Sequence, residues 1–224
     1  MNRTRIKFCG LTRVEDVRAA AELGVDAIGF VLTRKSRRFV EPAQAHALRE
    51  ALPPFVCAVA LFMDDDAAWV ERAVATMQPD LLQFHGEETA QFAARFARPY
   101  LKAVPMASVA DVAAFASSHP RACGFLLDSH VAGAAGGSGD AFDWTRVPRD
   151  FARPLVLAGG LDANNVAQAI ALARPCAVDV SSGIESAPGL KDASKMRAFV
   201  EAVRAADARP AGSPALSSAL SSSP

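Results

Sequence analysis

Short apolar runs alternate along this chain with longer segments in which apolar residues recur every three or four positions. Eight of the short runs have the length and composition of β-strands, and each is followed by a turn and usually by a helix-like segment. They span Arg5 to Phe8, Ala27 to Val31, Val56 to Phe62, Leu81 to Phe84, Tyr100 to Val104, Gly124 to Leu127, Leu155 to Leu157, and Ala177 to Val180. Eight βα units in strict alternation predict a parallel α/β sheet, and this number favours a closed (β/α)8 TIM barrel.

The longer segments are rich in alanine and fit amphipathic helices. Clear examples are Pro42 to Ala51, Ala67 to Met77, Val109 to Ser117, Asn165 to Ala173, and Ala193 to Ala206. An open, doubly wound sheet is the main alternative to the barrel. That architecture often binds dinucleotides, but no G-x-G-x-x-G follows the first strand and no acidic residue closes the second. Dinucleotide binding is therefore poorly supported.

The 224 residues fit a single domain, because a (β/α)8 barrel needs about 200 to 250 residues. We assign residues 1–207 to a catalytic barrel domain. Residues 208–224 consist mainly of alanine, serine and proline with almost no bulky side chains. Such a segment cannot bury enough surface to order itself, so we expect a disordered tail.

Charge and cysteine content narrow the class of function. The chain has 24 basic and 24 acidic residues, so no overall field favours nucleic acid or a membrane surface. No apolar run is long enough to cross a bilayer, and no signal-peptide pattern opens the chain. The four cysteines show no C-x-x-C or zinc spacing. We therefore expect a cytoplasmic enzyme without a metal site, and a monomer because no exposed apolar helix face is evident.

Side chains in a strand alternate between two faces, so residues two apart point the same way. On this rule Lys7 and Cys9 share one face of the first strand, and Ile6 and Phe8 share the other. The same spacing pairs Gln83 with His85, Leu126 with Asp128, and Asp179 with Ser181. The polar residues at the strand ends are therefore expected to point into the barrel mouth, where parallel α/β folds carry their chemistry.

Two strand ends carry groups suited to acid–base catalysis. Cys9 follows Lys7 on one face, and a nearby ammonium favours the thiolate, which acts as a base or a nucleophile. The alternative is an inert buried cysteine. Asp128 ends an apolar strand, where it is either an acid for catalysis or a helix cap or loop charge. If both face the barrel mouth, they form an acid/base pair.

Loops after the strands predict an anionic ligand. Three glycine-rich turns follow late strands: Gly136-Gly137-Ser138-Gly139, Gly159-Gly160 and Ser181-Ser182-Gly183. Barrels often bind phosphate there through backbone N–H groups, so the three turns together predict a phosphate site. The basic run Arg34 to Arg38 is either a solvated loop or the source of an arginine that grips a carboxylate. His85 is either a ligand-binding donor or a structural histidine.

Taken together, the motifs resemble those of the phosphoribosylanthranilate isomerase family of tryptophan biosynthesis. The similar segments occur in the family's order over about residues 5–200. They are Lys7-Phe8-Cys9-Gly10-Leu11-Thr12, Gly29-Phe30, Ser36-Arg37-Arg38-Phe39-Val40, Leu82-Gln83-Phe84-His85-Gly86-Glu87, Leu126-Leu127-Asp128-Ser129, Gly136-Gly137-Ser138-Gly139, Phe142-Asp143-Trp144, Leu157-Ala158-Gly159-Gly160-Leu161, Asn165-Val166, Val178-Asp179-Val180-Ser181-Ser182-Gly183-Ile184-Glu185, Gly189 and Lys191-Asp192.

The resemblance implies a single-domain barrel that converts N-(5-phosphoribosyl)anthranilate to 1-(o-carboxyphenylamino)-1-deoxyribulose 5-phosphate by an Amadori rearrangement, without cofactor or metal. It implies that Cys9 is the general base, that Asp128 is the general acid, and that Arg38 binds the anthranilate carboxylate. The glycine-rich turns would hold the phosphate. The expected substrate-binding residues are Lys7, Arg38, Gln83, His85, Gly137, Ser138, Gly139, Gly159, Gly160, Asp179, Ser181, Ser182 and Gly183.

This chemistry needs an ionised Cys9 and a protonated Asp128 near neutral pH. We expect Lys7 to lower the pKa of Cys9, and an apolar setting beside Leu126 to raise the pKa of Asp128. Arg37 stands where the family usually has proline, which leaves open whether it shares the carboxylate contact with Arg38. Another phosphoribosyl-barrel isomerase and a catalytically silent, anion-binding barrel are the alternatives.

Overall fold

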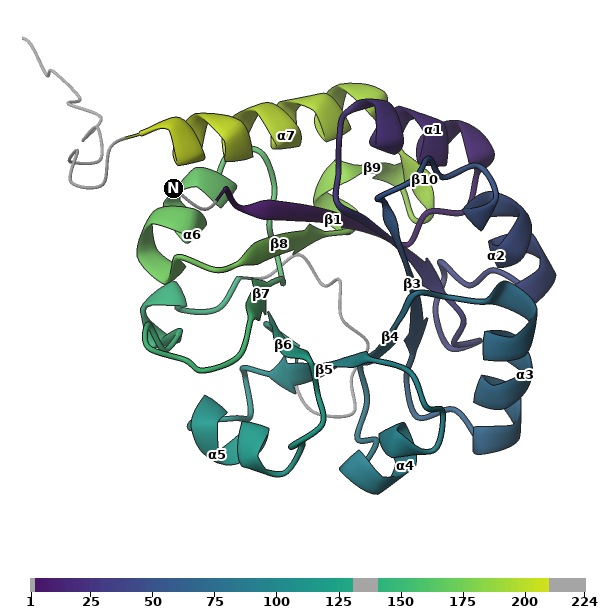
Figure 1. Ribbon diagram of the computed structural model, residues 1–224. Coiled ribbons are helices and arrows are strands. Elements are labelled where there is room, and N and C mark those ends of the chain that lie inside the picture. The colour runs from purple at the N-terminus through teal and green to yellow at the C-terminus, as the bar shows by residue number, and fades with distance from the viewer. Residues whose placement is uncertain (1–2, 131–140, 210–224) are drawn as a thin grey trace, which may run out of the picture.

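Eight parallel strands close into a barrel in the computed structural model, which describes residues 3–130 and 141–209 (Figure 1). Each strand pairs with its neighbours in chain order, and β1 closes the ring on β8. The strands are β1 (Arg5–Cys9), β2 (Ala27–Val31), β3 (Cys57–Phe62), β4 (Leu81–Phe84), β5 (Tyr100–Pro105), β6 (Gly124–Asp128), β7 (Leu155–Leu157) and β8 (Ala177–Val180). The predicted barrel and its eight strands are confirmed, with each strand end within one residue of the prediction.

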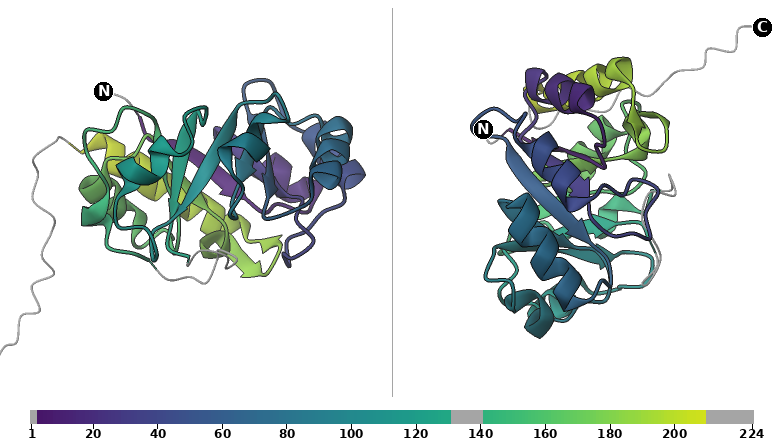
Figure 2. Two further views of the ribbon diagram at one scale, coloured as in Figure 1. Left: turned by 90° about the horizontal axis from the view of Figure 1, so that it is seen from below. Right: turned by 90° about the vertical axis from the view of Figure 1, so that its right-hand side faces the viewer.

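Helices surround the strands (Figures 1 and 2). They are α1 (Val14–Glu22), α2 (Pro42–Arg49), α3 (Ala67–Met77), α4 (Ala90–Ala94), α5 (Val112–Ser117), α6 (Val166–Ala173) and α7 (Ala193–Ala208), with the 3-10 turns η1 (Trp144–Arg146) and η2 (Ser182–Ile184). Helix α5 starts three residues later than predicted. The Asp111 carboxylate caps it by accepting the N–H groups of Ala113 and Ala114, and Arg146 holds the carbonyl of Val109 outside the helix.

The last helix joins the two ends of the described chain. Phe199 of α7 packs edge-on against Phe8 of β1, with ring centroids 6.1 Å apart. The Asp207 carboxylate accepts hydrogen bonds from the backbone N–H and the hydroxyl of Thr4 at 2.8 and 2.7 Å. Of the predicted tail at 208–224, only Ala208, which ends α7, and Arg209 are described, and 210–224 lie outside the described residues.

A short antiparallel hairpin that the sequence did not predict follows η2. It consists of β9 (Glu185–Ala187) and β10 (Leu190–Lys191). It is fastened to the loop after β1, because Thr12 donates to the carbonyl of Gly189 at 2.7 Å. The hairpin therefore brings two charged residues, Glu185 and Lys191, to the end of the barrel where β1 finishes.

Alternation along the strands divides the core into two layers. The outward side chains, such as Phe8, Phe84 and Val178, pack with the helices in one large apolar cluster. A smaller cluster fills part of the barrel interior and comes from β5 to β8: Leu101, Ala103, Leu126, Val156, Ala158 and Ala177. The predicted division of Ile6 and Phe8 from Lys7 and Cys9 is confirmed. No helix of the described residues has the length and apolarity needed to cross a membrane.

Candidate active site

A pocket opens at the carboxyl ends of the strands. It is lined by Cys9, Val31, Thr33, Lys35, Ser36, Arg38, Leu61, Met63, Gln83, His85, Asp128, Asp179 and Ser181. Seven of these are residues that the sequence analysis selected: Cys9, Arg38, Gln83, His85, Asp128, Asp179 and Ser181. The polar ends of β1, β4, β6 and β8 therefore meet at one place, as strand alternation predicted.

Cys9 lies at the end of β1 and is only 5% exposed. It has room because its partner in the β1–β2 register is Gly29, where an added Cβ would lie 2.8 Å from Cys9 Sγ and 3.1 Å from Lys7 Nζ. Burial raises the pKa of the Cys9 thiol, and the opposing charge of Lys7 does not offset it. The expectation that Lys7 acts to lower this pKa is correct in sign, but burial has the larger effect.

Lys7 and Asp179 form a buried ion pair beneath the pocket, with Nζ and Oδ1 2.8 Å apart. They are register partners on β1 and β8, so their closeness follows from how the barrel closes. Burial alone would lower the pKa of Lys7, but Asp179 and Cys9 raise it above its ordinary value. Lys7 therefore stays cationic and places a fixed positive charge beside the thiol.

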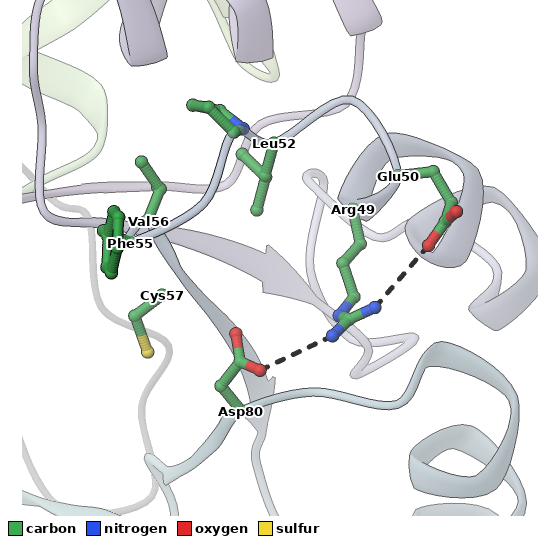
Figure 3. Close-up of a pocket in the computed structure, with 8 residues that line it drawn as sticks. Arg49, Glu50, Leu52, Phe55, Val56, Cys57 and Asp80 are labelled. Atoms are coloured by element: carbon green, nitrogen blue, oxygen red, sulfur yellow. Dashed lines mark ion pairs between the residues drawn. The ribbon is translucent and has the colours of Figure 1, made fainter.

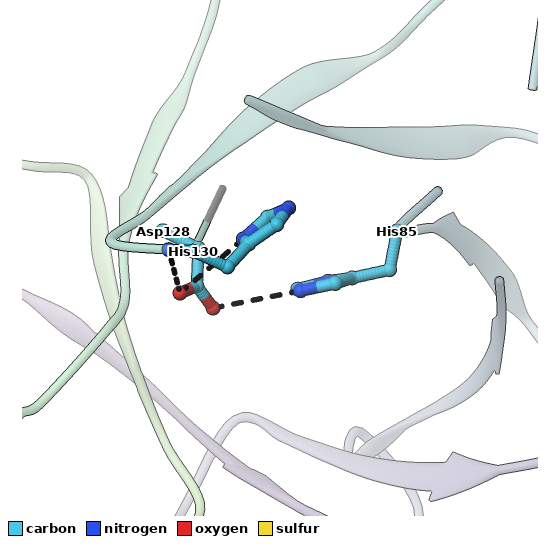
Figure 4. A group of neighbouring side chains, drawn as sticks. All are labelled: His85, Asp128 and His130. Atoms are coloured by element: carbon cyan, nitrogen blue, oxygen red, sulfur yellow. Dashed lines mark hydrogen bonds and ion pairs between the residues drawn. The ribbon is translucent and has the colours of Figure 1, made fainter. Parts of the chain in front are cut away.

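Asp128 ends β6, and its carboxylate faces two histidines, His85 and His130 (Figure 4). Its Oδ2 lies 3.6 Å from His85 Nε2, and its Oδ1 lies 3.4 Å from His130 Nδ1 and accepts the His130 backbone N–H at 3.2 Å. Burial alone would raise the pKa of this carboxyl, but His130 and His85 together hold it below its usual value. The expectation of a raised pKa in an apolar setting is wrong, because the neighbours that decide it are imidazoles.

His85 is buried and stacks on His130, with ring centroids 4.5 Å apart. Its Nδ1 lies 3.2 Å from the amide nitrogen of Gln83, two residues earlier on the same strand face. Burial lowers the pKa of His85 to about 4, so the ring is neutral near pH 7. With Asp128, the two rings form a group of described residues whose donor atoms are close enough to share a metal ion.

Arg38 reaches the pocket from the loop after β2 and is held in place by the β9–β10 hairpin. Its Nε and Nη2 donate to the two carboxylate oxygens of Glu185, each at 2.7 Å. Lys191 also donates to Glu185 at 2.8 Å, so one carboxylate faces two cations. Arg37 is exposed and does not line the pocket, which favours Arg38 as the ligand of a carboxylate.

The turns after β6, β7 and β8 lie against one another. An added Cβ on Gly159, whose φ is +79°, would lie 2.5 Å from the backbone nitrogen of Ser129. One on Gly183 would lie 2.0 Å from the carbonyl oxygen of Leu161. These contacts bring Gly159 and Gly160 next to Ser181, Ser182 and Gly183, as a shared anion site requires. The predicted ligands Gly137, Ser138 and Gly139 lie outside the described residues.

A second hollow lies at the opposite, amino end of the barrel (Figure 3). Its lining includes Arg49, Phe55, Cys57 and Asp80, from the segments that precede β3 and β4. Burial raises the pKa of Cys57 to about 11, and no cation is hydrogen-bonded to it among the described residues. The ion pairs of this hollow are long contacts of Arg49, 3.5 Å from Asp80 and 3.6 Å from Glu50. The chemistry therefore favours the carboxyl end.

Three charged or titratable side chains that bond to predicted site residues are themselves absent from the prediction: His130, Glu185 and Lys191. The alternation of side chains along a strand could have indicated His130, because it lies two residues after Asp128. Glu185 and Lys191 stand in the motifs that carry the resemblance, but their role depends on a hairpin that no local pattern announces.

Comparison with known proteins gives one family. Residues 6–202 match the family described as N-(5'phosphoribosyl)anthranilate (PRA) isomerase. The N-(5'-phosphoribosyl)anthranilate isomerase of Xanthomonas oryzae pv. oryzae is 53% identical over 211 residues, which cover 92% of this chain and 95% of that relative.

Solved structures agree with the sequence comparison. Phosphoribosyl anthranilate isomerase from Thermotoga maritima superposes with a TM-score of 0.80 at 35% identity, covering 90% of this chain and 99% of that chain. A phosphoribosyl anthranilate isomerase in complex with reduced 1-(o-carboxyphenylamino)-1-deoxyribulose 5-phosphate superposes with a TM-score of 0.74 at 33% identity, with the same coverage.

Proposed function

The chain belongs to the N-(5'-phosphoribosyl)anthranilate isomerase family, and from that premise we propose that Cys9 and Asp128 are the base and acid of its reaction. It is an isomerase of tryptophan biosynthesis that rearranges a phosphoribosyl aminoaldose to an aminoketose. The observation that carries the assignment is that a thiol and a carboxylic acid, on strands separated by β7 and β8, line one pocket.

The reaction proceeds through two proton transfers, one to the furanose ring oxygen and one from C2. Asp128 donates a proton to the furanose ring oxygen while the bond from C1 to that oxygen breaks, and the anthranilate nitrogen forms an iminium with C1. The Cys9 thiolate then removes the proton from C2, and the electron pair of that bond forms the enolamine double bond. The enolamine tautomerises to the ketone. The iminium accepts the electrons, so acid and base supply the catalysis.

In the free enzyme, the fraction of molecules that can react depends on whether Cys9 or Asp128 carries the proton. Burial raises the pKa of Cys9 and the histidines lower that of Asp128, so the prevalent form carries its proton on sulfur. The reactive form has the same proton count, with the proton on Asp128 instead. Between the two pKa values its population is therefore independent of pH, although it is small.

The two anionic ends of the substrate are bound on opposite sides of the reacting carbons. Arg38 binds the anthranilate carboxylate through the edge of its guanidinium that Glu185 leaves free. The adjoining turns that contain Gly160, Ser182 and Gly183 bind the phosphate through backbone N–H groups. Holding both ends fixes C2 and the ring oxygen between base and acid, which lowers the entropic cost of reaction.

Turnover of freshly prepared phosphoribosylanthranilate, followed by the loss of its fluorescence, tests the assignment. Wild type is expected to turn over, Cys9→Ala to fall by about 10⁴-fold, and Cys57→Ala to match wild type. Circular dichroism of each variant checks that it folds. A folded Cys9→Ala protein with full turnover would refute the role of Cys9, and a folded wild type without turnover would favour the silent barrel. We also place the enzyme in the cytoplasm, in keeping with its four free thiols.

A further inference from the structure

Three side chains with metal-binding atoms meet at the end of β6: His85, Asp128 and His130 (Figure 4). One ligand atom from each, a ring nitrogen or a carboxylate oxygen, lies within 4.8 Å of the other two. All three side chains are buried. Imidazole nitrogen and carboxylate oxygen are ordinary ligands of Zn²⁺ and of similar transition metal ions.

The spacing of these atoms suits a metal ion better than hydrogen bonds. His85 Nε2 lies 3.6 Å from one oxygen of Asp128, and His130 Nδ1 lies 3.4 Å from the other. Both separations exceed those of good N–H···O bonds. Zinc–ligand bonds of about 2.0–2.1 Å at tetrahedral angles put adjacent ligand atoms about 3.4 Å apart. The two distances run to different oxygens of Asp128, and each is close to one ligand–ligand separation of such a site.

The ring nitrogens that face Asp128 also lack other partners. His85 Nε2, His130 Nδ1 and Gln83 Oε1 are buried and make no hydrogen bond with the described residues. Turning the Gln83 amide by half a turn brings its oxygen next to His85 Nδ1, which then donates the ring proton to it. In that orientation His85 Nε2 carries a lone pair that faces Asp128. A histidine oriented in this way by its second nitrogen is the usual arrangement of a metal ligand.

We propose that His85, Asp128 and His130 bind one Zn²⁺ or similar transition metal ion reversibly, and that the bound ion inhibits the isomerase. The ion takes the place of the proton on the carboxylate, so Asp128 can no longer protonate the ring oxygen. It also lies beside the substrate pocket, because His85 and Asp128 both line it. The inhibition rests on the proposed role of Asp128, whereas the binding does not. Mg²⁺ prefers oxygen ligands and is expected to leave turnover unchanged.

Calorimetric titration of the metal-free full chain with zinc sulfate tests the binding. Wild type is expected to bind one ion. His130→Gln is expected to bind it at least about 100-fold more weakly, because it loses one of three ligands. His46→Gln, changed on α2 outside the barrel, is the matched control and is expected to bind as wild type does. Absence of binding in wild type, or equal affinity in His130→Gln and wild type, would overturn the site.

Turnover measured against zinc concentration tests the inhibition in the same three proteins. Each is compared with its own rate in a chelator, so a change in basal rate does not affect the result. Half-inhibition is expected to need about 100-fold more zinc in His130→Gln than in wild type or His46→Gln. Binding without inhibition would refute the inhibitory role. Failure of the proposed function would look different, because turnover would then be absent in the chelator as well.

The Cys9 thiolate is the rival ligand in this pocket, and Co²⁺ distinguishes the two. Co²⁺ bound by His85, Asp128 and His130 is expected to show visible d–d bands without the near-ultraviolet charge-transfer band of a cobalt–thiolate bond. A charge-transfer band that disappears in Cys9→Ser would assign the ion to sulfur and overturn the proposal.

Discussion

The two ends of the barrel carry the same kinds of side chain in different surroundings. A cysteine, an aspartate and an arginine lie beside a pocket at each end: Cys9, Asp128 and Arg38 at the carboxyl end, and Cys57, Asp80 and Arg49 at the amino end. At the carboxyl end the charge of Lys7 acts on Cys9, Arg38 pairs with Glu185 at 2.7 Å, and Asp128 lies 3.4 Å from His130. At the amino end Asp80 is half-exposed and pairs with Arg49 only at 3.5 Å.

Position in the fold explains this difference. The carboxyl ends of parallel strands are extended by loops that fold back over the barrel, and here the β9–β10 hairpin brings Glu185 and Lys191 to Arg38. The loops that lead from the helices into the amino ends of the strands are mostly shorter. The polar side chains there remain near water, where ion pairs contribute little to stability. The same residue types therefore form an active site only where they are buried beside charged partners.

Replacing the aspartate at each end should give the largest contrast. Asp128→Asn keeps the shape of the side chain but cannot supply the proton, so kcat is expected to fall by about 10²- to 10⁴-fold. Asp80→Asn is expected to leave kcat unchanged and to lower stability only slightly, since it weakens one hydrogen bond to the backbone N–H of Ala58. Steady-state kinetics beside thermal unfolding separates the two effects. Equal kcat losses in both variants would contradict the comparison.

Replacing the arginine at each end should give the next largest contrast. Arg38→Met removes a charge-assisted contact with the substrate carboxylate, which is expected to raise KM by about 10- to 100-fold. Glu185 keeps Lys191 as a partner, so the variant is expected to fold. Arg49→Met is expected to leave KM unchanged, because its ion pairs are long and on the surface. A Michaelis plot of each protein makes the measurement, and an unchanged KM in Arg38→Met would move the carboxylate site elsewhere.

The residues that face the two cysteines across the β-ladder offer a third contrast. Gly29→Ala places a methyl 2.8 Å from Cys9 Sγ, and overpacking of this kind costs about 1–3 kcal/mol of unfolding free energy. Ala27, the register partner of Cys57, already carries such a methyl. Ala27→Gly is expected to cost about 0.5–1 kcal/mol and to keep turnover. Denaturant titration gives both free energies, and a Gly29→Ala protein as stable as wild type would show that the pocket has spare room.

Much of this comparison could be predicted from the sequence. The features that could not be predicted depend mostly on contacts between residues far apart in the chain. Strand positions follow from outward residues such as Phe8 and Phe84, which must be apolar to pack under helices. The direction of the Asp128 pKa did not follow, because it depends on how His130 folds back onto the carboxylate and on His85, which comes from the end of β4. The Arg38–Glu185 pair joins residues 147 positions apart, so it becomes visible only once the hairpin is folded.

The pH dependence of kcat/KM should reflect the buried Cys9 and Asp128, with His85 titrating near the acid limb at a pKa of about 4. As pH falls through the lowered pKa of Asp128, both groups become protonated and the base is lost. As pH rises through the raised pKa of Cys9, the shared proton leaves and the acid is lost. The profile is therefore expected to be flat from about pH 5 to pH 8, with limbs on both sides. Rates measured in a chelator test this, and a tenfold rise per pH unit through neutrality would contradict it.

The smallest effect is expected at Phe55, beside the amino-end pocket. Its side chain is fully exposed, and its backbone has a φ of +74°. A phenylalanine buries about 150–250 Å² at most, whereas a stable interface needs about 800 Å² on each partner. One such side chain therefore does not hold two copies together, and the chain is expected to sediment as a monomer. Phe55→Ser should keep both the sedimentation coefficient and turnover. A wild-type dimer that Phe55→Ser converts to monomer would show that the amino end is an interface.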